Sequence, residues 1–437
     1  MNERRPSERS LAAVWHPCTQ MKAHEKMPPV AIARGSGAWL YDFEGRRYLD
    51  AISSWWVNLF GHANPRINAA LRDQLERLEH VMLAGLTHEP VIELSEQLAA
   101  LTGARLGHCF YASDGASAIE IALKMSAHYW RNRGLPRKHR FVALANGYHG
   151  ETLGALAVTD LGLFKAPYAD LVATAATVPS PDWRLAEPGE TPADYAGRCA
   201  AALESHLQRH HTEIAALVVE PLVQCAGGMA MYHPEYLRRA RALCERFAVH
   251  LVADEIAVGM GRTGTMLACE QAAITPDFLC LSKGLSGGYL PLSVVLTSDA
   301  VYRAFYDDDP ARGFLHSHSY TGNPLACRAA LATLAIFRDD DVIAANRARS
   351  EKLGRMLEPL ARHPRVRAFR NTGMIWAFEV DSRDPQFARS FHAAALERGL
   401  LLRPLGNTVY LMPPYVLDDE QCELLASATL ALVDAAG

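Results

Sequence analysis

The sequence has no long apolar run. No stretch of its 437 residues approaches the roughly 18 apolar residues that a membrane-spanning helix needs. The first 20 residues are polar, so the sequence also lacks the apolar core of a secretory signal, which covers roughly 7–15 residues. We therefore expect no membrane partner.

Disulfide and metal-binding patterns are also missing. The nine cysteines are odd in number and contain no Cys-x-x-Cys pair, which favours reduced thiols in a cytoplasm over a disulfide scaffold. The acidic triplets at 307–309 and 339–341 lack the alternating oxygen ligands of a calcium loop. His316 and His318 have no cysteine or carboxylate partner at the usual spacing of zinc ligands. We expect a cytoplasmic protein without a bound metal.

Neither sign of charge dominates. The chain carries 44 Lys and Arg against 48 Asp and Glu, a formal net charge of −4. A protein that binds nucleic acid through its phosphates shows a basic excess. We therefore expect no nucleic-acid partner.

The sequence does contain an alternation of helix-length segments and short apolar strands between about residues 90 and 330. Such strands predict an α/β fold with a largely parallel sheet that helices cover on both faces; they are expected at 141–144, 214–219, 250–253, 278–281 and 292–297. A chain of this length exceeds one hydrophobic core. We expect a large ligand-binding domain over 61–330 and a small α+β domain over 331–437, and we expect the N-terminal arm and strands of 1–60 to join the small domain.

Lys283 follows one of these predicted strands, Phe278–Leu281, and is itself followed by Gly284. Ligands bind at the carboxyl ends of strands in such sheets. A lysine that loses solvation there has a lowered pKa and can attack a carbonyl carbon. The alternative is a lysine that ends a core strand and does no chemistry.

Asp254 ends the preceding strand, 29 residues before Lys283 (283 − 254). This separation is about one crossover unit, so the two residues can lie on neighbouring strands. Glu220 also falls at the end of a predicted strand. A buried carboxylate could hold a pyridine nitrogen protonated, as pyridoxal phosphate requires, or it could simply cap a loop.

Two further segments suit a phosphorylated, flat cofactor. Ser113–Ser117 places small residues at the start of a long helix, where free backbone N–H groups can bind a phosphate. Tyr148 follows a predicted strand and could stack on a ring. The alternatives are an ordinary helix N-cap and a core tyrosine.

The segment Gly259–Gly264 matches the Gly-x-Gly-x-x-Gly pattern of dinucleotide-binding proteins. That pattern requires the glycines immediately after a strand and at the start of a helix. Asp254–Val258 intervenes here, and Arg262 and Thr263 fill the turn. We therefore do not expect a nicotinamide site.

Taken together, these segments resemble class III, fold-type I pyridoxal-phosphate-dependent aminotransferases over essentially the whole chain. The resemblance depends on four segments: Asp254-Glu255-Ile256, Gly259–Gly264, Leu281-Ser282-Lys283-Gly284 and Tyr320-Thr321-Gly322-Asn323-Pro324. It implies a large domain with a mostly parallel, seven-stranded sheet and a smaller α+β domain. It also implies pyridoxal 5′-phosphate as cofactor and transamination with ping-pong kinetics.

The resemblance assigns the cofactor-binding residues. Lys283 is the lysine that bonds to the cofactor and, once released, moves the proton. Asp254 pairs with the pyridine nitrogen. Gly115 and Ala116 hold the phosphate through backbone groups, although the family often has serine at the position of Ala116.

The resemblance also implies a homodimer with shared active sites. In such a dimer His318 and Ser319 reach the phosphate in the other subunit. Tyr148, beside the cofactor, and Trp55 line the substrate pocket, and Ser317 offers a backbone contact.

Other segments resemble the branch of the family that acts in biotin biosynthesis. This branch transfers an amino group from S-adenosylmethionine to 8-amino-7-oxononanoate. The segments are Trp15-His16-Pro17, Ser53-Ser54-Trp55-Trp56, Gly147-Tyr148-His149-Gly150, Val223–Met229, Arg403–Gly406 and Tyr410–Pro414. The resemblance implies that Arg403 pairs with the carboxylate of the keto acid, a task that suits its planar fork.

Cys18 departs from that branch, in which the residue after the proline is usually a substrate-pocket tyrosine. Relatives that use lysine as the amino donor differ at this position. We hypothesise S-adenosylmethionine as donor, and lysine stays open. The sequence also leaves open a class III ω-aminotransferase for ornithine, 4-aminobutyrate or β-alanine, a cofactor-binding protein without transferase activity or an aminomutase, and a dehydrogenase.

Overall fold

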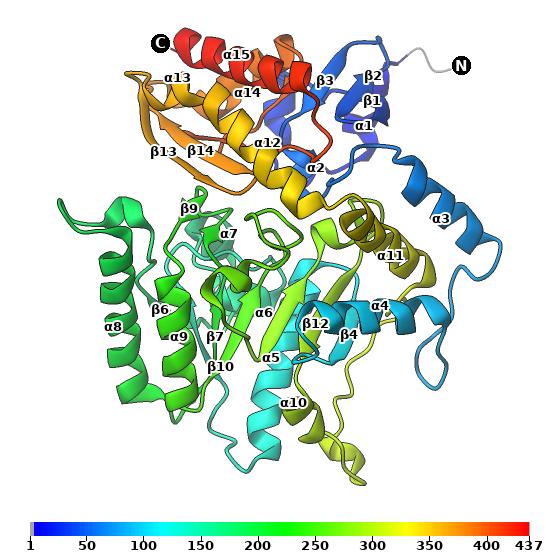
Figure 1. Ribbon diagram of the computed structural model, residues 1–437, viewed down its shortest axis with the longest axis vertical. Coiled ribbons are helices and arrows are strands. Elements are labelled where there is room, and N and C mark those ends of the chain that lie inside the picture. The colour runs from blue at the N-terminus through cyan, green and yellow to red at the C-terminus, as the bar shows by residue number, and fades with distance from the viewer. Residues whose placement is uncertain (1–3, 437) are drawn as a thin grey trace.

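A computed structural model describes residues 4–436, and its centre is a seven-stranded sheet (Figure 1). The strand order is β4-β12-β11-β10-β7-β5-β6. β12 runs antiparallel to both of its neighbours, and the other pairs are parallel. The strands are β4 (His108–Ala112), β5 (Arg140–Leu144), β6 (Ala176–Val178), β7 (Ile214–Val219), β10 (His250–Asp254), β11 (Phe278–Leu281) and β12 (Ser293–Thr297). The mostly parallel sheet predicted from the sequence is confirmed.

Helices cover both faces of this sheet because its strands are apolar on both sides. α5 (Gly115–Asn132) packs on one face, against a cluster that includes Val218 and Val252. The other face is buried in the main core, with α8 (Pro192–His210) and α9 (Glu235–Arg246) side by side. The remaining helices of this part are α3 (Pro65–Leu75), α4 (Glu89–Leu101), α6 (Leu153–Val158), α7 (Gly162–Lys165), α10 (Asp299–Arg303) and α11 (Pro324–Asp339).

The C-terminal part of the chain forms a smaller three-stranded antiparallel sheet in the order β13-β14-β16. Its strands are β13 (Val366–Thr372), β14 (Ile375–Val380) and β16 (Thr408–Leu411). Its helices are α12 (Val342–Met356), α13 (Glu358–Ala361), α14 (Phe387–Glu397) and α15 (Asp419–Ala435). A two-stranded ribbon, β8 (Val223–Gln224) and β9 (Ala230–Met231), follows β7.

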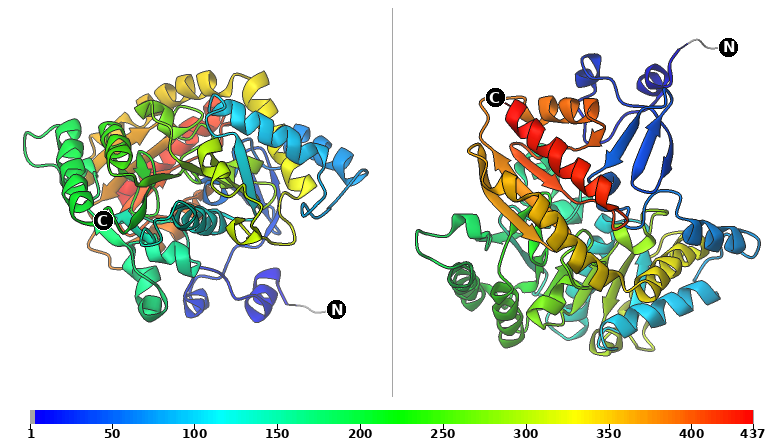
Figure 2. Two further views of the ribbon diagram at one scale, coloured as in Figure 1. Left: turned by 90° about the horizontal axis from the view of Figure 1, so that it is seen from below. Right: turned by 45° about the horizontal axis from the view of Figure 1, so that its top comes forward.

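The two ends of the chain meet in a third sheet, of order β1-β2-β3-β15. Its N-terminal strands are β1 (Ile32–Ser36), β2 (Trp39–Asp42) and β3 (Arg47–Asp50), and β15 (Leu400–Leu401) pairs in parallel with β3. Figure 2 shows these blue strands beside the orange and red C-terminal elements. This pairing places Ser53–Trp56, which form α2, next to the segment that follows β15.

The N-terminal arm contains a helix, α1 (Pro6–Ala13), because proline begins the helix and Arg5 and Glu8 pair at its start. No helix in the described part of the chain is long and apolar enough to cross a membrane.

Candidate active site

Three side chains with titratable groups meet at the carboxyl edge of the seven-stranded sheet. Asp254 ends β10, and Lys283 follows β11, which is the parallel neighbour of β10. Glu220 follows β7, which pairs with β10 on its other side. The expectation that Asp254 and Lys283 lie at neighbouring strands is confirmed. This edge is where parallel sheets bind ligands.

Lys283 occupies a strained backbone position with φ +44°. Its Nζ lies 5.4 Å from the ring centroid of Trp56. Burial lowers the pKa of Lys283 because it disfavours the ammonium form, and the nearby Asp254 is the main group that opposes this effect. A lysine with a lowered pKa has a larger neutral fraction, which is the nucleophilic and basic form.

Asp254 is buried, and each of its two carboxyl oxygens has a hydrogen-bond partner in the protein. Its Oδ2 lies 2.7 Å from Nδ1 of His149, and its Oδ1 accepts a hydrogen bond of 3.1 Å from the backbone N–H of Ile256. Burial alone would lower the pKa of His149, but the hydrogen bond and charge of Asp254 outweigh it and raise that pKa. The hydrogen bond from His149 fixes the orientation of the Asp254 carboxyl group.

Sequence reasoning assigned no role to His149. The only signal was its place beside Tyr148 in a Gly-Tyr-His-Gly segment after a predicted strand. Its partner Asp254 is 105 positions away in the chain. Nε2 of His149 is buried and has no hydrogen-bond partner among the described residues. His149 therefore holds the Asp254 side chain in place through this hydrogen bond.

Glu220 fixes the loop that carries Tyr148. Its Oε1 accepts a bond of 3.0 Å from the N–H of Tyr148, and its Oε2 accepts one of 3.0 Å from the N–H of Cys225. Burial raises the pKa of Glu220 to about 7, with the charge of Asp254 adding to the effect and His149 opposing it. The sequence placed Glu220 at a strand end but gave it no role.

Tyr148 is half-buried, and its hydroxyl donates a hydrogen bond of 2.9 Å to Oε1 of Glu151. Its ring centroid lies 5.6 Å from that of Phe164. Burial, followed by the hydrogen bond to Glu151, raises the pKa of Tyr148, so the hydroxyl stays neutral at physiological pH.

Gly115 and Ala116 form the first turn of α5, next to Asp254. Asp114 caps this turn by accepting a 2.9 Å bond from the N–H of Ser117. A Cβ on Gly115 would lie 3.0 Å from the side chain of Ile256, so a larger residue would fit only if that side chain shifted. The first N–H groups of a helix lack intrahelical partners and attract anions. The observed geometry therefore suits a phosphate group.

Ser53–Trp56 form a left-handed turn, with φ values of +52°, +46°, +71° and +72°. Left-handed conformations cost roughly 1–2 kcal/mol per L-residue. The turn directs two neighbouring indoles to different surroundings. Trp56 is buried beside Lys283, whereas Trp55 is 42% exposed with its ring 5.0 Å from the guanidinium carbon of Arg403.

The N-terminal arm reaches the same region. Nη2 of Arg403 donates a hydrogen bond of 3.3 Å to the backbone oxygen of Cys18. The side chain of Cys18 is exposed, and its backbone has a φ of +50°. Cys18, Trp55 and Arg403 therefore lie together, although they come from opposite ends of the sequence.

The loop with Ser317, His318 and Ser319 is not joined to this cluster by any hydrogen bond within residues 4–436. Ser317 and Ser319 are exposed, and His318 is half-buried with an Nε2 that has no partner in this part of the chain. Nδ1 of His318 accepts a 3.2 Å bond from the N–H of Tyr320.

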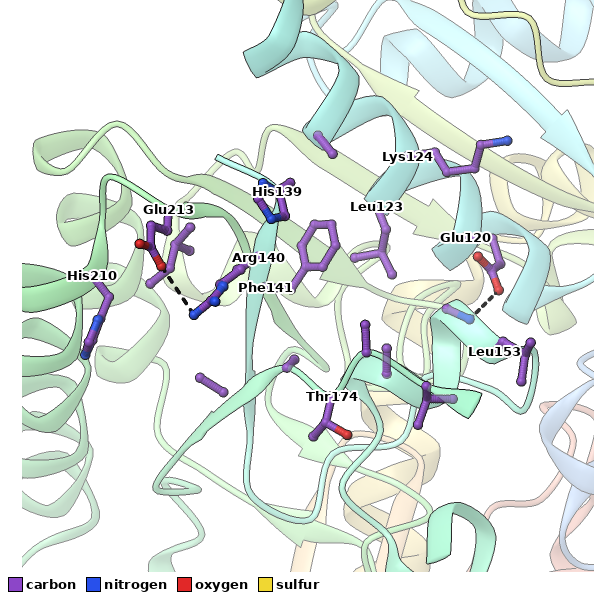
Figure 3. Close-up of a pocket in the computed structure, with 18 of the residues that line it drawn as sticks. Glu120, Leu123, Lys124, His139, Arg140, Phe141, Leu153, Thr174, His210 and Glu213 are labelled. Atoms are coloured by element: carbon purple, nitrogen blue, oxygen red, sulfur yellow. Dashed lines mark hydrogen bonds and ion pairs between the residues drawn. The ribbon is translucent and has the colours of Figure 1, made fainter. Parts of the chain in front are cut away.

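A cavity of about 860 Å³ lies apart from these residues, between α5, α6 and the first residues of β5 (Figure 3). The N–H of Gly154 donates a 2.7 Å hydrogen bond to Glu120 there, and Arg140 pairs with Glu213 at 3.3 Å. Neither Lys283 nor Asp254 lines this cavity.

The Gly259–Gly264 segment has a structural role. It forms a turn that no α-helix follows directly. Arg262, 1% exposed, donates hydrogen bonds to the backbone oxygens of Asn58 at 3.0 Å and Pro413 at 2.7 Å. Through Arg262 the segment connects residues from both ends of the chain to the loop that follows β10. This structural role accounts for the buried arginine, so no bound dinucleotide is needed to explain it.

Comparison with known proteins agrees with this geometry. Residues 20–432 match the family model described as aminotransferase class-III. A Helicobacter pylori protein named adenosylmethionine-8-amino-7-oxononanoate aminotransferase is 46% identical over 97% of this chain and 96% of its own length. A protein of the same name from Geobacter sulfurreducens is 39% identical over 94% of this chain and 93% of its own.

Solved structures give the same result. The crystal structure of an enzyme of that name from Methanocaldococcus jannaschii has a TM-score of 0.92 at 32% identity, and the match covers 98% of each chain. A PLP-bound amine transaminase from an uncultivated Pseudomonas species also has a TM-score of 0.92 at 32% identity, covering 97% of this chain and 99% of its own. The chain therefore belongs to the class-III aminotransferase family.

Proposed function

We propose that this protein is a pyridoxal-phosphate-dependent transaminase that transfers an amino group from S-adenosylmethionine to 8-amino-7-oxononanoate in biotin biosynthesis. The observation that carries the proposal is the placement of Asp254 and Lys283 at the ends of neighbouring strands. The printed names of the relatives support the choice of acceptor and donor.

The residues present fit the cofactor. Asp254, hydrogen-bonded to His149, would hold the pyridine nitrogen, and the first turn of α5 at Gly115 and Ala116 would hold the phosphate. When bound, pyridoxal phosphate supplies a ring that withdraws electrons from the carbon that carries the amino group. Lys283, whose pKa burial lowers, would serve as the base that removes a proton from one carbon and returns it to another.

The residues around Lys283 prepare the pocket for two substrates in turn. Trp55, and Tyr148 on its loop, would cover the reacting atoms and exclude water. The guanidinium group of Arg403 lies beside Trp55, at the proposed substrate pocket. Its planar fork would bind the carboxylate of the keto acid in a bidentate manner. Ser317 would offer a backbone contact.

We further propose a cytoplasmic homodimer in which His318 and Ser319 bind the phosphate in the partner's site. The exposure of Ser317 and Ser319 and the unpartnered Nε2 of His318 support this arrangement. The chain would divide into a large domain over 61–330 and a small domain over 331–437, with residues 1–60 joined to the latter through the β3–β15 pair.

The donor is tested by separate half-reactions. Purified enzyme loaded with pyridoxal phosphate is mixed with S-adenosylmethionine or with lysine, and the absorbance band of the cofactor is followed. We expect S-adenosylmethionine to bleach the band. Bleaching by lysine alone would assign lysine as donor, in keeping with Cys18 on the arm beside Arg403.

A further inference from the structure

The left-handed turn Ser53–Trp56 needs an external support. Its four residues are L-amino acids with positive φ, and none is glycine. Left-handed residues normally occur singly. Consecutive strained residues persist only where the surrounding structure over-determines them, and such strain gathers at functional sites.

Asp50 provides most of that support. It is fully buried at the end of β3. Its Oδ1 accepts a 2.8 Å bond from the N–H of Ser54, and its Oδ2 accepts a 2.7 Å bond from the Ser54 hydroxyl. These two hydrogen bonds from Ser54 to one carboxyl group fix the backbone at the second position of the turn.

A second layer holds Asp50 in place. Nε2 of His62 lies 3.0 Å from Oδ2 of Asp50, and Nδ1 of His62 lies 3.0 Å from the amide nitrogen of Asn58. Because the Asn58 amide nitrogen can only donate, Nδ1 of His62 accepts and its Nε2–H donates to Asp50. At the start of the turn, the Ser53 hydroxyl donates a 2.7 Å bond to the backbone oxygen of Met412.

The consequence of the turn is the placement of two indoles. Trp56 is buried next to Lys283 and Tyr410, while Trp55 remains partly exposed over Arg403. A relaxed backbone at Ser54 would change the direction of the Trp55 side chain. The contact between Trp55 and Arg403 therefore depends on Asp50, which makes no hydrogen bond to either of them within residues 4–436.

We propose that Asp50 is a positioning residue for substrate specificity: it holds Ser54 in the left-handed conformation and so presents Trp55, beside Arg403, to the keto-acid substrate. This inference rests on the proposed function, because it identifies the pocket of Trp55 and Arg403 as the binding site of 8-amino-7-oxononanoate. Loss of the support weakens substrate binding and leaves the chemistry at Lys283 largely intact.

Two substitutions of Ser54 separate this role from a general structural one. Ser54→Ala and Ser54→Gly both lose the hydroxyl bond to Asp50, but only glycine adopts positive φ without strain. In the holoenzyme, Ser54→Ala raises KM for 8-amino-7-oxononanoate about tenfold, while its kcat stays within about threefold of the wild-type value. The KM of Ser54→Gly stays within about threefold of the wild-type KM. Ser205→Ala, on the exposed surface of α8, is the control and changes neither constant.

A second readout needs no turnover. The protein is labelled with 5-fluorotryptophan, and the resonance of Trp55 among the seven tryptophans is the one that Trp55→Phe removes. In ¹⁹F spectra of the holoenzyme this resonance shifts or broadens in Asp50→Asn and Ser54→Ala and keeps its position in Ser54→Gly. If Asp50→Asn fails to fold, the comparison of Ser54→Ala with Ser54→Gly tests the proposal without it.

Unchanged KM and an unchanged Trp55 resonance in Ser54→Ala would overturn the role of Asp50. Equal defects in Ser54→Ala and Ser54→Gly would overturn it too, because the backbone conformation would then be irrelevant. If the wild-type enzyme does not convert 8-amino-7-oxononanoate, the proposed function fails instead, and the ¹⁹F comparison still decides whether Asp50 positions Trp55.

Discussion

Nδ1 of His149 lies 2.7 Å from Oδ2 of Asp254, and both side chains are buried at the carboxyl edge of the seven-stranded sheet. This contact joins the loop after β5 to the end of β10. It fixes the position of the Asp254 carboxyl group. The proposed contact between Asp254 and the pyridine nitrogen depends on that position.

Replacement of His149 by asparagine is expected to weaken cofactor binding and to lower kcat by roughly tenfold or more, because Asp254 loses its buried imidazole hydrogen-bond partner. The measurement is kcat with saturating pyridoxal phosphate, together with the dissociation constant of the cofactor. His139→Asn, at an exposed histidine, is the control. Wild-type values in His149→Asn would show that Asp254 needs no such support.

Arg403→Lys is expected to raise KM for 8-amino-7-oxononanoate roughly tenfold, because lysine keeps the charge and loses the bidentate fork. Initial rates at fixed donor concentration measure the effect. Arg389→Lys, on the exposed face of α14, should leave KM unchanged. An Arg403→Lys enzyme with normal KM would remove Arg403 from the carboxylate site.

Shared active sites predict complementation between two inactive subunits. Mixed refolding of Lys283→Ala and His318→Ala chains produces heterodimers in which one site has an intact Lys283 and receives an intact His318 from the partner. About a quarter of wild-type activity is expected if assembly is random. No recovery in verified heterodimers would place His318 in the site of its own chain.

Stability below neutral pH is expected to depend on His250. Burial lowers the pKa of His250 to about 4, and its Nδ1 lies 2.9 Å from the Ser126 hydroxyl. Since the unfolded chain takes up this proton near pH 6.5, the stabilisation is complete above that pH and is lost as the pH falls toward 4. The loss is at most about 3 kcal/mol.

Thermal unfolding between pH 7 and 4 measures this effect, and His250→Asn is expected to flatten the decline of Tm over that range. The exposed His139→Asn variant should decline like the wild type. A His250→Asn protein with the wild-type slope would assign the acid sensitivity to other groups.

The strand ends were predictable from the sequence because local signals mark them. Asp254 and Lys283 each follow a short run of apolar residues, and parallel strands bring such ends to one edge. The role of His149 was not predictable, since its partner lies in a distant segment and no local pattern links the two.

The turn at Ser53–Trp56 escaped prediction for a different reason. Positive φ is normally signalled by glycine or asparagine, and Ser-Ser-Trp-Trp contains neither. Its conformation is imposed by Asp50 and by the backbone oxygen of Met412, which is 359 positions from Ser53. Tertiary contacts here override local preference, so only the folded chain shows the arrangement.

The central claim is that the amine of Lys283 moves the proton during amino transfer. The most direct test is the rate of a single half-reaction with S-adenosylmethionine, measured by stopped-flow absorbance in wild type and Lys283→Ala. Lys352→Ala is the control, since Lys352 is a partly exposed lysine that pairs with Asp419. We expect the rate of Lys283→Ala to fall by at least about a thousandfold and that of Lys352→Ala to stay at the wild-type value. A Lys283→Ala enzyme that transfers the amino group at the wild-type rate would contradict the account.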